Sequence, residues 1–207
     1  MGRITWDRVQ SALEARPNGR VSEPVHRAAV AMVLREVGEG LELLFIRRAE
    51  DPRDPWSGQV AFPGGRAEPE DPSLQVTAVR ETAEEVGLDL AACGECLGAL
   101  DEVQARAKMQ LLNLAIAPYV FRLAGGPTAE PRSEVKSVHW LALDDLLGPE
   151  RRSTMEYVHE GLRMEFPCLR VGELVIWGLT YRMLMGLRER LGLAEGLTGA
   201  IEVGARG

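Results

Sequence analysis

Apolar and polar positions follow one another along the chain in patterns that predict both helices and strands. Residues 4–19 have the spacing of an amphipathic helix, which Pro17 and Gly19 would end. Residues 26–49 contain two apolar runs around Gly38 and Gly40, and this pattern predicts a β-hairpin. Further predicted elements are strands at 94–101, 113–122 and 135–141, and helices at 141–147 and 176–191. Strands separated by helices favour a single mixed domain of the α/β or α+β class.

The segment 72–86 has the clearest helix signals in the chain. Asp71 suits the N-cap position, and Pro72 suits the first helical turn. Gly87 can end the helix in the left-handed conformation. Successive side chains turn by about 100°, so two different faces are expected. The apolar face would carry Val76, Val79, Ala83 and Val86, and the opposite face Glu81, Glu84 and Glu85.

The acidic face of this helix has two interpretations. Many surface helices expose a solvated acidic face, so the helix by itself does not establish a site. Carboxylates three and four positions apart nevertheless repel one another. A hard divalent cation would remove that repulsion, because Mg²⁺ prefers carboxylate oxygens and keeps several of its waters.

The stretch "FPGGRAEPEDP" (62–72) leads into this helix and favours the second interpretation. Its adjacent glycines, Gly64 and Gly65, allow positive φ and let backbone groups approach a ligand closely. A glycine turn followed by three clustered carboxylates is suited to holding metal ions against phosphate oxygens. We therefore expect the loop to form the floor of a metal–phosphate site and the helix to form its wall.

Composition narrows the class of protein. A chain of 207 residues with 45% hydrophobic residues is long enough for one domain with a sizeable core. Its net charge of −7 argues against non-specific nucleic-acid binding, which needs a surplus of Lys and Arg. No segment reaches the roughly 18 uninterrupted apolar residues of a membrane span, and the first residues lack the apolar run of a secretory signal.

The three cysteines are too few for a disulfide framework. Cys93 and Cys96 have the spacing of a metal-binding pair, but no second pair or nearby histidine completes a zinc site. These features predict a cytoplasmic protein that binds neither nucleic acid nor membranes.

The residues around the glycine loop and the acidic helix resemble a known signature. Gly65 and "RETAEEVGL" (80–88) look like the Nudix box, which ends in R-E-U-x-E-E-x-G-U, where U is aliphatic. Thr82 is the poorer match, and Asp71 takes the acidic place of the usual box. The segment from Asp71 to Arg80 is one residue longer than in the usual box, which is a feature of the coenzyme A pyrophosphatase branch. The positions that match are Arg80, Glu81, Glu84, Glu85, Gly87 and Leu88.

A second stretch, "LFIRRAEDPRDPWSGQVAFPGG" (44–65), resembles the substrate signature of that branch. It matches at Arg48, Ala49, Arg53, Gly58 and the final Phe-Pro-Gly-Gly. It departs from the signature at Ile46, where a threonine is expected, and by one extra residue in "DPWS". The late "VIWGLTYRML" (175–184) looks like the closing helix of the branch, so the resemblance covers roughly residues 25–190.

The resemblance implies a Nudix α/β/α sandwich with a mixed β-sheet, in the α/β class. It divides the chain into an N-terminal helix and linker (1–24), a Nudix hydrolase domain (25–192) and a C-terminal tail (193–207). It implies Mg²⁺- or Mn²⁺-dependent hydrolysis of a nucleoside diphosphate linked to a group X, with coenzyme A or an acyl-CoA as substrate. The products would be adenosine 3′,5′-bisphosphate and 4′-phosphopantetheine. Homodimers are frequent in the family, so a homodimer is one expected assembly.

The resemblance also assigns roles to the box residues. Glu81, Glu84 and Glu85 would hold the metal ions, and the carbonyl of Gly65 is a further candidate ligand. Arg80 would orient the carboxylates, and its spacing to Glu84 permits an i,i+4 ion pair. A plain surface salt bridge is the alternative role for this arginine.

The general base stays open between the box and a loop outside it. Glu84 or Glu81 could take this role, and some relatives use a loop glutamate instead. Glu134 in "PRSEVKSVHW" is the first candidate for such a loop base, and Glu102 is the second. A solvated acidic side chain is the alternative for both loop residues.

Four residues near the loop are candidates for binding substrate. Arg48 and Arg53 could hold phosphates, including the 3′-phosphate of coenzyme A, because arginine contacts phosphate through two donors. Trp56 could stack on an aromatic base or form a wall of the pocket. Gly64 would let the backbone approach the phosphates.

Two other functions remain open at this point. The chain could be a Nudix pyrophosphatase for ADP-ribose, dinucleotides or nucleotide sugars. It could also be a non-catalytic nucleotide-binding module that keeps the fold. The intact glutamates argue against such a module, because without catalysis it has no need of three repelling carboxylates.

Overall fold

The structure is a computed structural model that describes residues 2–22, 26–52, 56–107, 110–132, 134–159 and 162–193. The helices are α1 (Trp6–Glu14), α2 (Leu74–Val86), α3 (Leu90–Cys93), α4 (Leu143–Leu147), the 3₁₀ turn η1 (Pro149–Arg151) and α5 (Gly178–Arg190). The strands are β1 (His26–Val37), β2 (Gly40–Arg48), β3 (Val60–Ala61), β4 (Gly64–Arg66), β5 (Gly94–Ala99), β6 (Val103–Ala107), β7 (Gln110–Leu123), β8 (Val135–Ala142), β9 (Arg152–His159), β10 (Leu162–Val171) and β11 (Leu174–Trp177).

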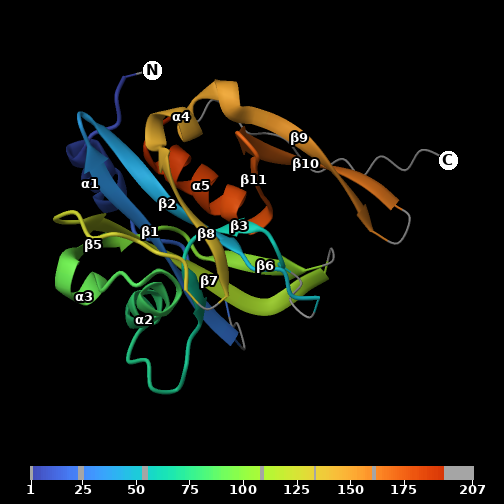
Figure 1. Ribbon diagram of the computed structural model, residues 1–207, viewed down its shortest axis with the longest axis horizontal. Coiled ribbons are helices and arrows are strands. Elements are labelled where there is room, and N and C mark those ends of the chain that lie inside the picture. Colours follow the sequence, from blue (N-terminus) through green and yellow to red (C-terminus); the bar gives the residue numbers. More distant parts are fainter. Residues whose placement is uncertain are drawn as a thin grey trace.

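Within the described residues, eight strands form one mixed sheet, and β9, β10 and β11 form a second, antiparallel sheet (Figure 1). The central order of the main sheet is β3-β2-β1-β7-β5, with β4 on β1, β6 on β7 and β8 on β2. Strands β1 and β7 are parallel, whereas the other pairs are antiparallel. Strand β4 pairs with β1, and β3 pairs with β2, beyond the residues where β1 and β2 pair with each other. The glycine loop therefore lies between β1 and β2, within the main sheet.

The β1–β2 hairpin is confirmed around the predicted turn. Val37 pairs with Gly40, so the turn consists of two residues, Gly38 and Glu39. Gly38 has a φ of 59°, which glycine adopts without steric cost. Two-residue hairpin turns need such left-handed positions, which explains why a glycine stands there.

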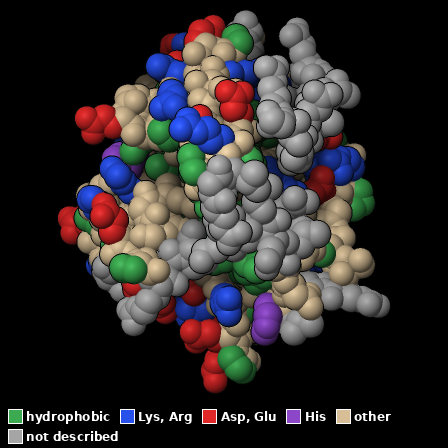
Figure 2. Space-filling view, turned by 90° about the vertical axis from the view of Figure 1, so that its right-hand side faces the viewer, with side chains coloured by type: hydrophobic (Ala, Val, Ile, Leu, Met, Phe, Trp, Pro, Cys, Tyr) green, Lys and Arg blue, Asp and Glu red, His purple; other side chains and the backbone are tan. Residues whose placement is uncertain are grey.

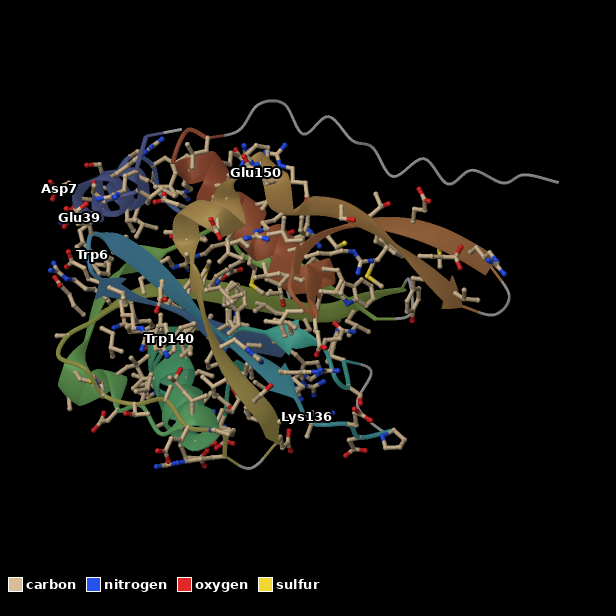
Figure 3. The ribbon with its side chains drawn as sticks, turned by 45° about the horizontal axis from the view of Figure 1, so that its top comes forward. Trp6, Asp7, Glu39, Lys136, Trp140 and Glu150 are labelled. Carbon is tan, nitrogen blue, oxygen red and sulfur yellow. The ribbon has the colours of Figure 1, made fainter. Side chains whose placement is uncertain are left out.

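The two faces of the main sheet contribute to two separate cores. Alternate β1 residues such as Met32 and Leu34 pack with α1, α4 and α5 on one face. Their neighbours Ala31 and Val33 pack with α2 and α3 on the other face. Figure 3 shows Trp140 of β8 beside α2, and this ring packs on the second core. The layers are therefore helices, sheet and helices, and the α/β class predicted from the sequence is confirmed.

Helix α2 begins two residues later than predicted, and its cap prediction was wrong. Ser73 is the N-cap, because its hydroxyl accepts a hydrogen bond from the Val76 N–H at 3.3 Å. Asp71 instead accepts a hydrogen bond from the Thr77 hydroxyl and binds an arginine of the helix. The predicted end is confirmed, since Gly87 has a φ of 72°.

The predicted apolar face of α2 was wrong in part. Val86 is buried and Val79 packs against the core as predicted, but Val76 is 39% exposed. The buried residues of the helix are Thr77, Ala78, Thr82, Glu85 and Val86. The helix is rotated so that the side bearing Glu85 faces the sheet and the glycine loop. Contact with that loop outweighs the burial of one valine.

The other predicted elements lie close to their predicted ranges, but one region was missed. The first helix ends at Glu14, before Pro17, and the last helix is preceded by strand β11. The sequence reading did not predict β6 or the β9–β10 hairpin, which extends beyond the main sheet in Figure 1. Alternating residues in "STMEYV" (153–158) were the available signal for that hairpin.

The predicted tail at 193–207 lies outside the described residues from position 194 onward. In the part of the chain that is described, no helix is long and apolar enough to cross a membrane. On the face that Figure 2 shows, basic and acidic side chains are interspersed, so neither sign forms a continuous area there.

Candidate active site

The glycine loop is held against β1 by close backbone contacts. Gly64 has a φ of 153°, and a Cβ at this position would lie 2.6 Å from Val30 Cα and would overlap the Ala29 carbonyl oxygen. Gly65 does not have a positive φ; a Cβ there would overlap the carboxylate of Glu81. The positive φ expected for the loop therefore occurs at Gly64, and Gly65 is required because Glu81 fills the space beside it.

Glu85 points from α2 into the loop and is the most buried of Glu81, Glu84 and Glu85. The residue is 8% exposed, and its Oε2 accepts a hydrogen bond from the Gly64 N–H at 2.9 Å. Arg48 Nη1 lies 3.9 Å from its Oε1. Burial raises the pKa of Glu85 to about 7, although this hydrogen bond and the charge of Arg48 act in the opposite direction. A buried carboxylate with so few hydrogen-bond donors around it is suited to bind a cation.

Glu81 and Glu84 differ in their surroundings. The side chain of Glu81 is 17% exposed, and burial raises its pKa even though Arg80 lies 3.0 Å away. The side chain of Glu84 is 58% exposed and lies 3.4 Å from Arg80 Nη1. The i,i+4 pair expected between Arg80 and Glu84 is therefore present. The two more buried glutamates, Glu81 and Glu85, face the loop, and Glu84 lies farther toward solvent.

Arg80 connects the acidic helix to the loop. Its guanidinium binds Asp71 through Nε at 3.1 Å and Nη2 at 3.0 Å, and it donates to the Arg66 carbonyl oxygen at 3.1 Å. The hydrogen bonds from Arg80 hold the pKa of Asp71 well below its usual range. Asp71 therefore anchors the arginine that orients Glu81. This role was missed because Asp71 was interpreted as a helix cap.

Arg48 and Glu134 meet beside Glu85, where Arg48 approaches the carboxylate oxygen that does not bind the Gly64 N–H. Arg48 Nη2 lies 3.6 Å from Glu134 Oε2, so its guanidinium bridges Glu134 and Glu85. The Arg48 side chain is 22% exposed, and that of Glu134 is 75% exposed. This arrangement places the predicted phosphate-binding arginine next to the predicted metal ligands.

One cavity of about 350 Å³ brings most of the predicted residues together. The predicted residues that line it are Arg48, Trp56, Gly64, Gly65, Glu81, Glu85 and Glu134. Of the described candidates, Arg80 and Glu84 do not line it, and Arg53 lies outside the described residues. Glu102 lies elsewhere, where it pairs with Arg27 at 2.8 Å.

The same cavity has an apolar half that the sequence did not predict. Its side chains come from β1, β3, β7 and α5, which are far apart in the chain; they are Val30, Val60, Leu114, Ile116, Leu179 and Met183. The Thr180 hydroxyl of α5 donates a hydrogen bond to the Val60 carbonyl oxygen at 3.0 Å, which links α5 to β3 beside the glycine loop. Only the tertiary structure places these side chains opposite the glutamates.

The residues fit a divalent metal ion. Two carboxylates with burial-raised pKa values, Glu81 and Glu85, face a loop in which a Cβ at Gly65 would fill the space. Such desolvated oxygen donors match the preference of Mg²⁺ and Mn²⁺. Among the described residues, no three His, Cys, Asp or Glu side chains converge as around a bound ion. Arg80 pairs with Glu81 and Glu84 in this arrangement, so metal binding would exchange those ion pairs for metal–oxygen bonds.

The sequence pattern of the NUDIX domain matches residues 24–160 of this chain. The chain belongs to the NUDIX family. It is 30% identical over 156 residues to the uncharacterized Nudix hydrolase NudL of Yersinia pestis, covering 73% of this chain and 73% of that protein. It is 39% identical over 117 residues to an uncharacterized protein of Schizosaccharomyces pombe, and this match spans 55% of this chain but only 36% of the yeast protein.

Solved structures support the fold. A MutT/nudix family protein from Enterococcus faecalis is similar with a TM-score of 0.56 and 17% identity, covering 91% of this chain and 70% of that chain. At this identity the likeness concerns the Nudix fold alone. Together with the family match, it confirms the superfamily, the fold and the enzyme class that the Nudix box implied: the chain is a Nudix hydrolase.

Proposed function

We propose that this Nudix hydrolase cleaves the pyrophosphate bond of coenzyme A or an acyl-CoA. The observation that carries the proposal is the two-part cavity, which Glu81 and Glu85 line together with a group of apolar side chains. Coenzyme A has the same two-part chemistry, because its pyrophosphate joins a nucleotide to the long, uncharged pantetheine arm. The substrate signature at 44–65 supports the same assignment.

The bound Mg²⁺ or Mn²⁺ ions would neutralise charge on the phosphoryl oxygens and lower the pKa of the attacking water. Glu85 and Glu81 would hold these ions, with Glu84 and the Gly65 carbonyl as further candidate ligands. Arg80, anchored by Asp71, would keep Glu81 directed at the loop. The backbone of Gly64 would stay close to the phosphates because no side chain intervenes.

Arg48 would bind the pyrophosphate itself. Its guanidinium is 3.9 Å from Glu85 Oε1, so a phosphate bound beside Glu85 would lie within reach of its donors. Glu134, on the other side of Arg48, would accept the proton of the attacking water. The water oxygen forms a bond to phosphorus, the bridging P–O bond breaks, and the leaving phosphate takes the electron pair. The products are adenosine 3′,5′-bisphosphate and 4′-phosphopantetheine.

A substrate panel tests this function. Coenzyme A, acetyl-CoA, dephospho-coenzyme A, ADP-ribose, a diadenosine polyphosphate and a nucleotide sugar would be incubated with the protein and Mg²⁺ or Mn²⁺, with a chelator control. Mass spectrometry would identify the products. We expect coenzyme A or acetyl-CoA to have the highest kcat/KM. Faster cleavage of ADP-ribose, the dinucleotide or the nucleotide sugar would refute the coenzyme A assignment and favour a different Nudix pyrophosphatase.

A further inference from the structure

A second cavity, of about 400 Å³, lies directly beside the proposed catalytic cavity. The two cavities share Gln59 and Val60, so a single substrate could occupy both. The second cavity is lined from β2, the 57–60 segment, β9 and β11. Its volume falls within the range of small-molecule sites.

Aromatic rings form one wall of this second cavity. Tyr157 of β9 and Trp177 of β11 both line it, with ring centroids 5.4 Å apart. Phe166 of β10 supports both rings, at 6.0 Å from Tyr157 and 5.9 Å from Trp177. The antiparallel sheet thus holds the two wall rings in place. Fixed aromatic faces of this kind bind planar bases by stacking.

Arg47 supplies a positive charge to the same cavity. It is half-buried, and the described residues give its guanidinium no hydrogen bond or ion pair. Adjacent strand residues point to opposite faces, so Arg47 faces β9 and β11, whereas Arg48 faces Glu85. Glu173 also lines the cavity without an ion pair to Arg47 among these residues. Glu50 pairs with Lys136 at 2.9 Å, and this pair lowers the pKa of Glu50 more than the charge of Arg47 does. A half-buried guanidinium with no ion pair among the described residues is suited to bind an anionic ligand group.

The catalytic cavity offers no comparable place for a second phosphate. Arg48 and Arg66 line it near the glycine loop, but most of the side chains in its other half are apolar, such as Ile116 and Met183. Burying a phosphate against these groups would be costly without a paired charge. The apolar half therefore suits the uncharged arm of the substrate, and the second cavity suits its charged, aromatic end.

We infer that the second cavity binds the nucleoside end of the substrate. The purine stacks on Tyr157 and Trp177, and Arg47 pairs with a phosphate that lies outside the scissile pyrophosphate. The inference rests on the proposed pyrophosphatase function and assigns Arg47 as the residue that determines substrate specificity. A substrate with a 3′-phosphate on its ribose carries such a group, and one without it does not.

The first test compares coenzyme A with dephospho-coenzyme A, which differ only in that phosphate. Arg47→Gln should lower kcat/KM for coenzyme A about 10- to 150-fold, the value of a charge-assisted contact. It should leave dephospho-coenzyme A nearly unchanged. Arg163→Gln is the matched control, because Arg163 is 76% exposed on β10 and pairs with Glu156 at 3.2 Å. Equal losses on both substrates, or no loss on coenzyme A, would overturn the inference.

A binding measurement separates this inference from the proposed function. Adenosine 3′,5′-bisphosphate and AMP would each be titrated into wild-type protein and Arg47→Gln by calorimetry, with no turnover required. We expect the variant to lose the preference for the bisphosphate and to bind AMP as the wild type does. An unchanged preference would overturn the inference even if coenzyme A is the substrate. A lost preference would support the subsite even if the protein does not cleave coenzyme A.

The stacking wall has its own pair of variants. Tyr157→Leu should weaken AMP binding about 5- to 150-fold, the value of one base–aromatic stack. Tyr157→Phe keeps the ring and should restore most of that affinity. Melting curves check that both variants are folded. Equal binding by the leucine and phenylalanine variants would show that the base does not stack there.

Discussion

Replacing Glu85 by glutamine should abolish most of the activity while leaving the fold intact. The two side chains have nearly the same size, and the glutamine Oε1 can still accept the hydrogen bond from the Gly64 N–H. The variant loses the negative charge that would bind the metal ion. We expect kcat to fall at least about 100-fold, which corresponds to over roughly 2.7 kcal/mol of transition-state stabilisation.

The same substitution should stabilise the metal-free protein at alkaline pH. Burial raises the pKa of Glu85 from its ordinary 4.5 to about 7. Between these values the folded state binds more protons than the unfolded state, so stability falls as pH rises through this window. Above pH 7 the ionised, buried carboxylate costs up to about 3 kcal/mol, since one pKa unit corresponds to about 1.4 kcal/mol. Glutamine removes that cost.

Thermal unfolding with and without Mg²⁺ measures both effects. At pH 8 with chelator, Glu85→Gln should melt roughly 6–12 °C above the wild type. At pH 4 the two proteins should melt alike, because Glu85 is then protonated in both states. Mg²⁺ should raise the melting temperature of the wild type at pH 8 and have little effect on the variant. Near wild-type turnover, or a variant that is less stable than the wild type at pH 8 without metal, would refute the reasoning.

Four further substitutions test the rest of the site. Gly65→Ala should reduce turnover with little loss of stability, because its Cβ displaces only the Glu81 carboxylate. Gly64→Ala should cost about 2 kcal/mol or more of stability, because its Cβ clashes with the β1 backbone. A larger loss of stability for Gly65→Ala than for Gly64→Ala would refute this contrast. Asp71→Asn should lower kcat by releasing Arg80, and wild-type kinetics would show that the Asp71 contact has no role in turnover. Glu134→Gln should lower kcat about 100-fold with an unchanged melting temperature, and wild-type kcat would exclude Glu134 as the base.

Local signals in the sequence were enough to identify the family and most of the individual elements. The spacing of Arg80, Glu81, Glu84 and Glu85 is a property of one helix turn, so it can be read without the fold. The hairpin and the end of α2 depend on glycines at positive φ, which act within a few residues. The β9–β10 hairpin was missed even though its alternation was present, because no turn signal was read there.

Which face of α2 is buried was decided only by the tertiary structure. Helical periodicity pointed to the valine side, but the helix turns Glu85 inward to meet the Gly64 N–H. Sequence spacing also could not reveal that Asp71 binds Arg80, since a cap and an ion-pair partner require the same residue type. In each case the competing interaction involves a partner outside the segment.

The two cavities depend entirely on long-range packing. Ile116 is far along the chain from Trp177 and Met183, and β7, β11 and α5 bring these side chains to the two neighbouring cavities. Arg47 and Arg48 are neighbours in sequence, yet the strand directs them to different sites. The sequence by itself identified the acidic helix and its glycine loop, because their signals are local. The tertiary structure decided what surrounds the pyrophosphate, because that surface is assembled from elements that meet only in the folded protein.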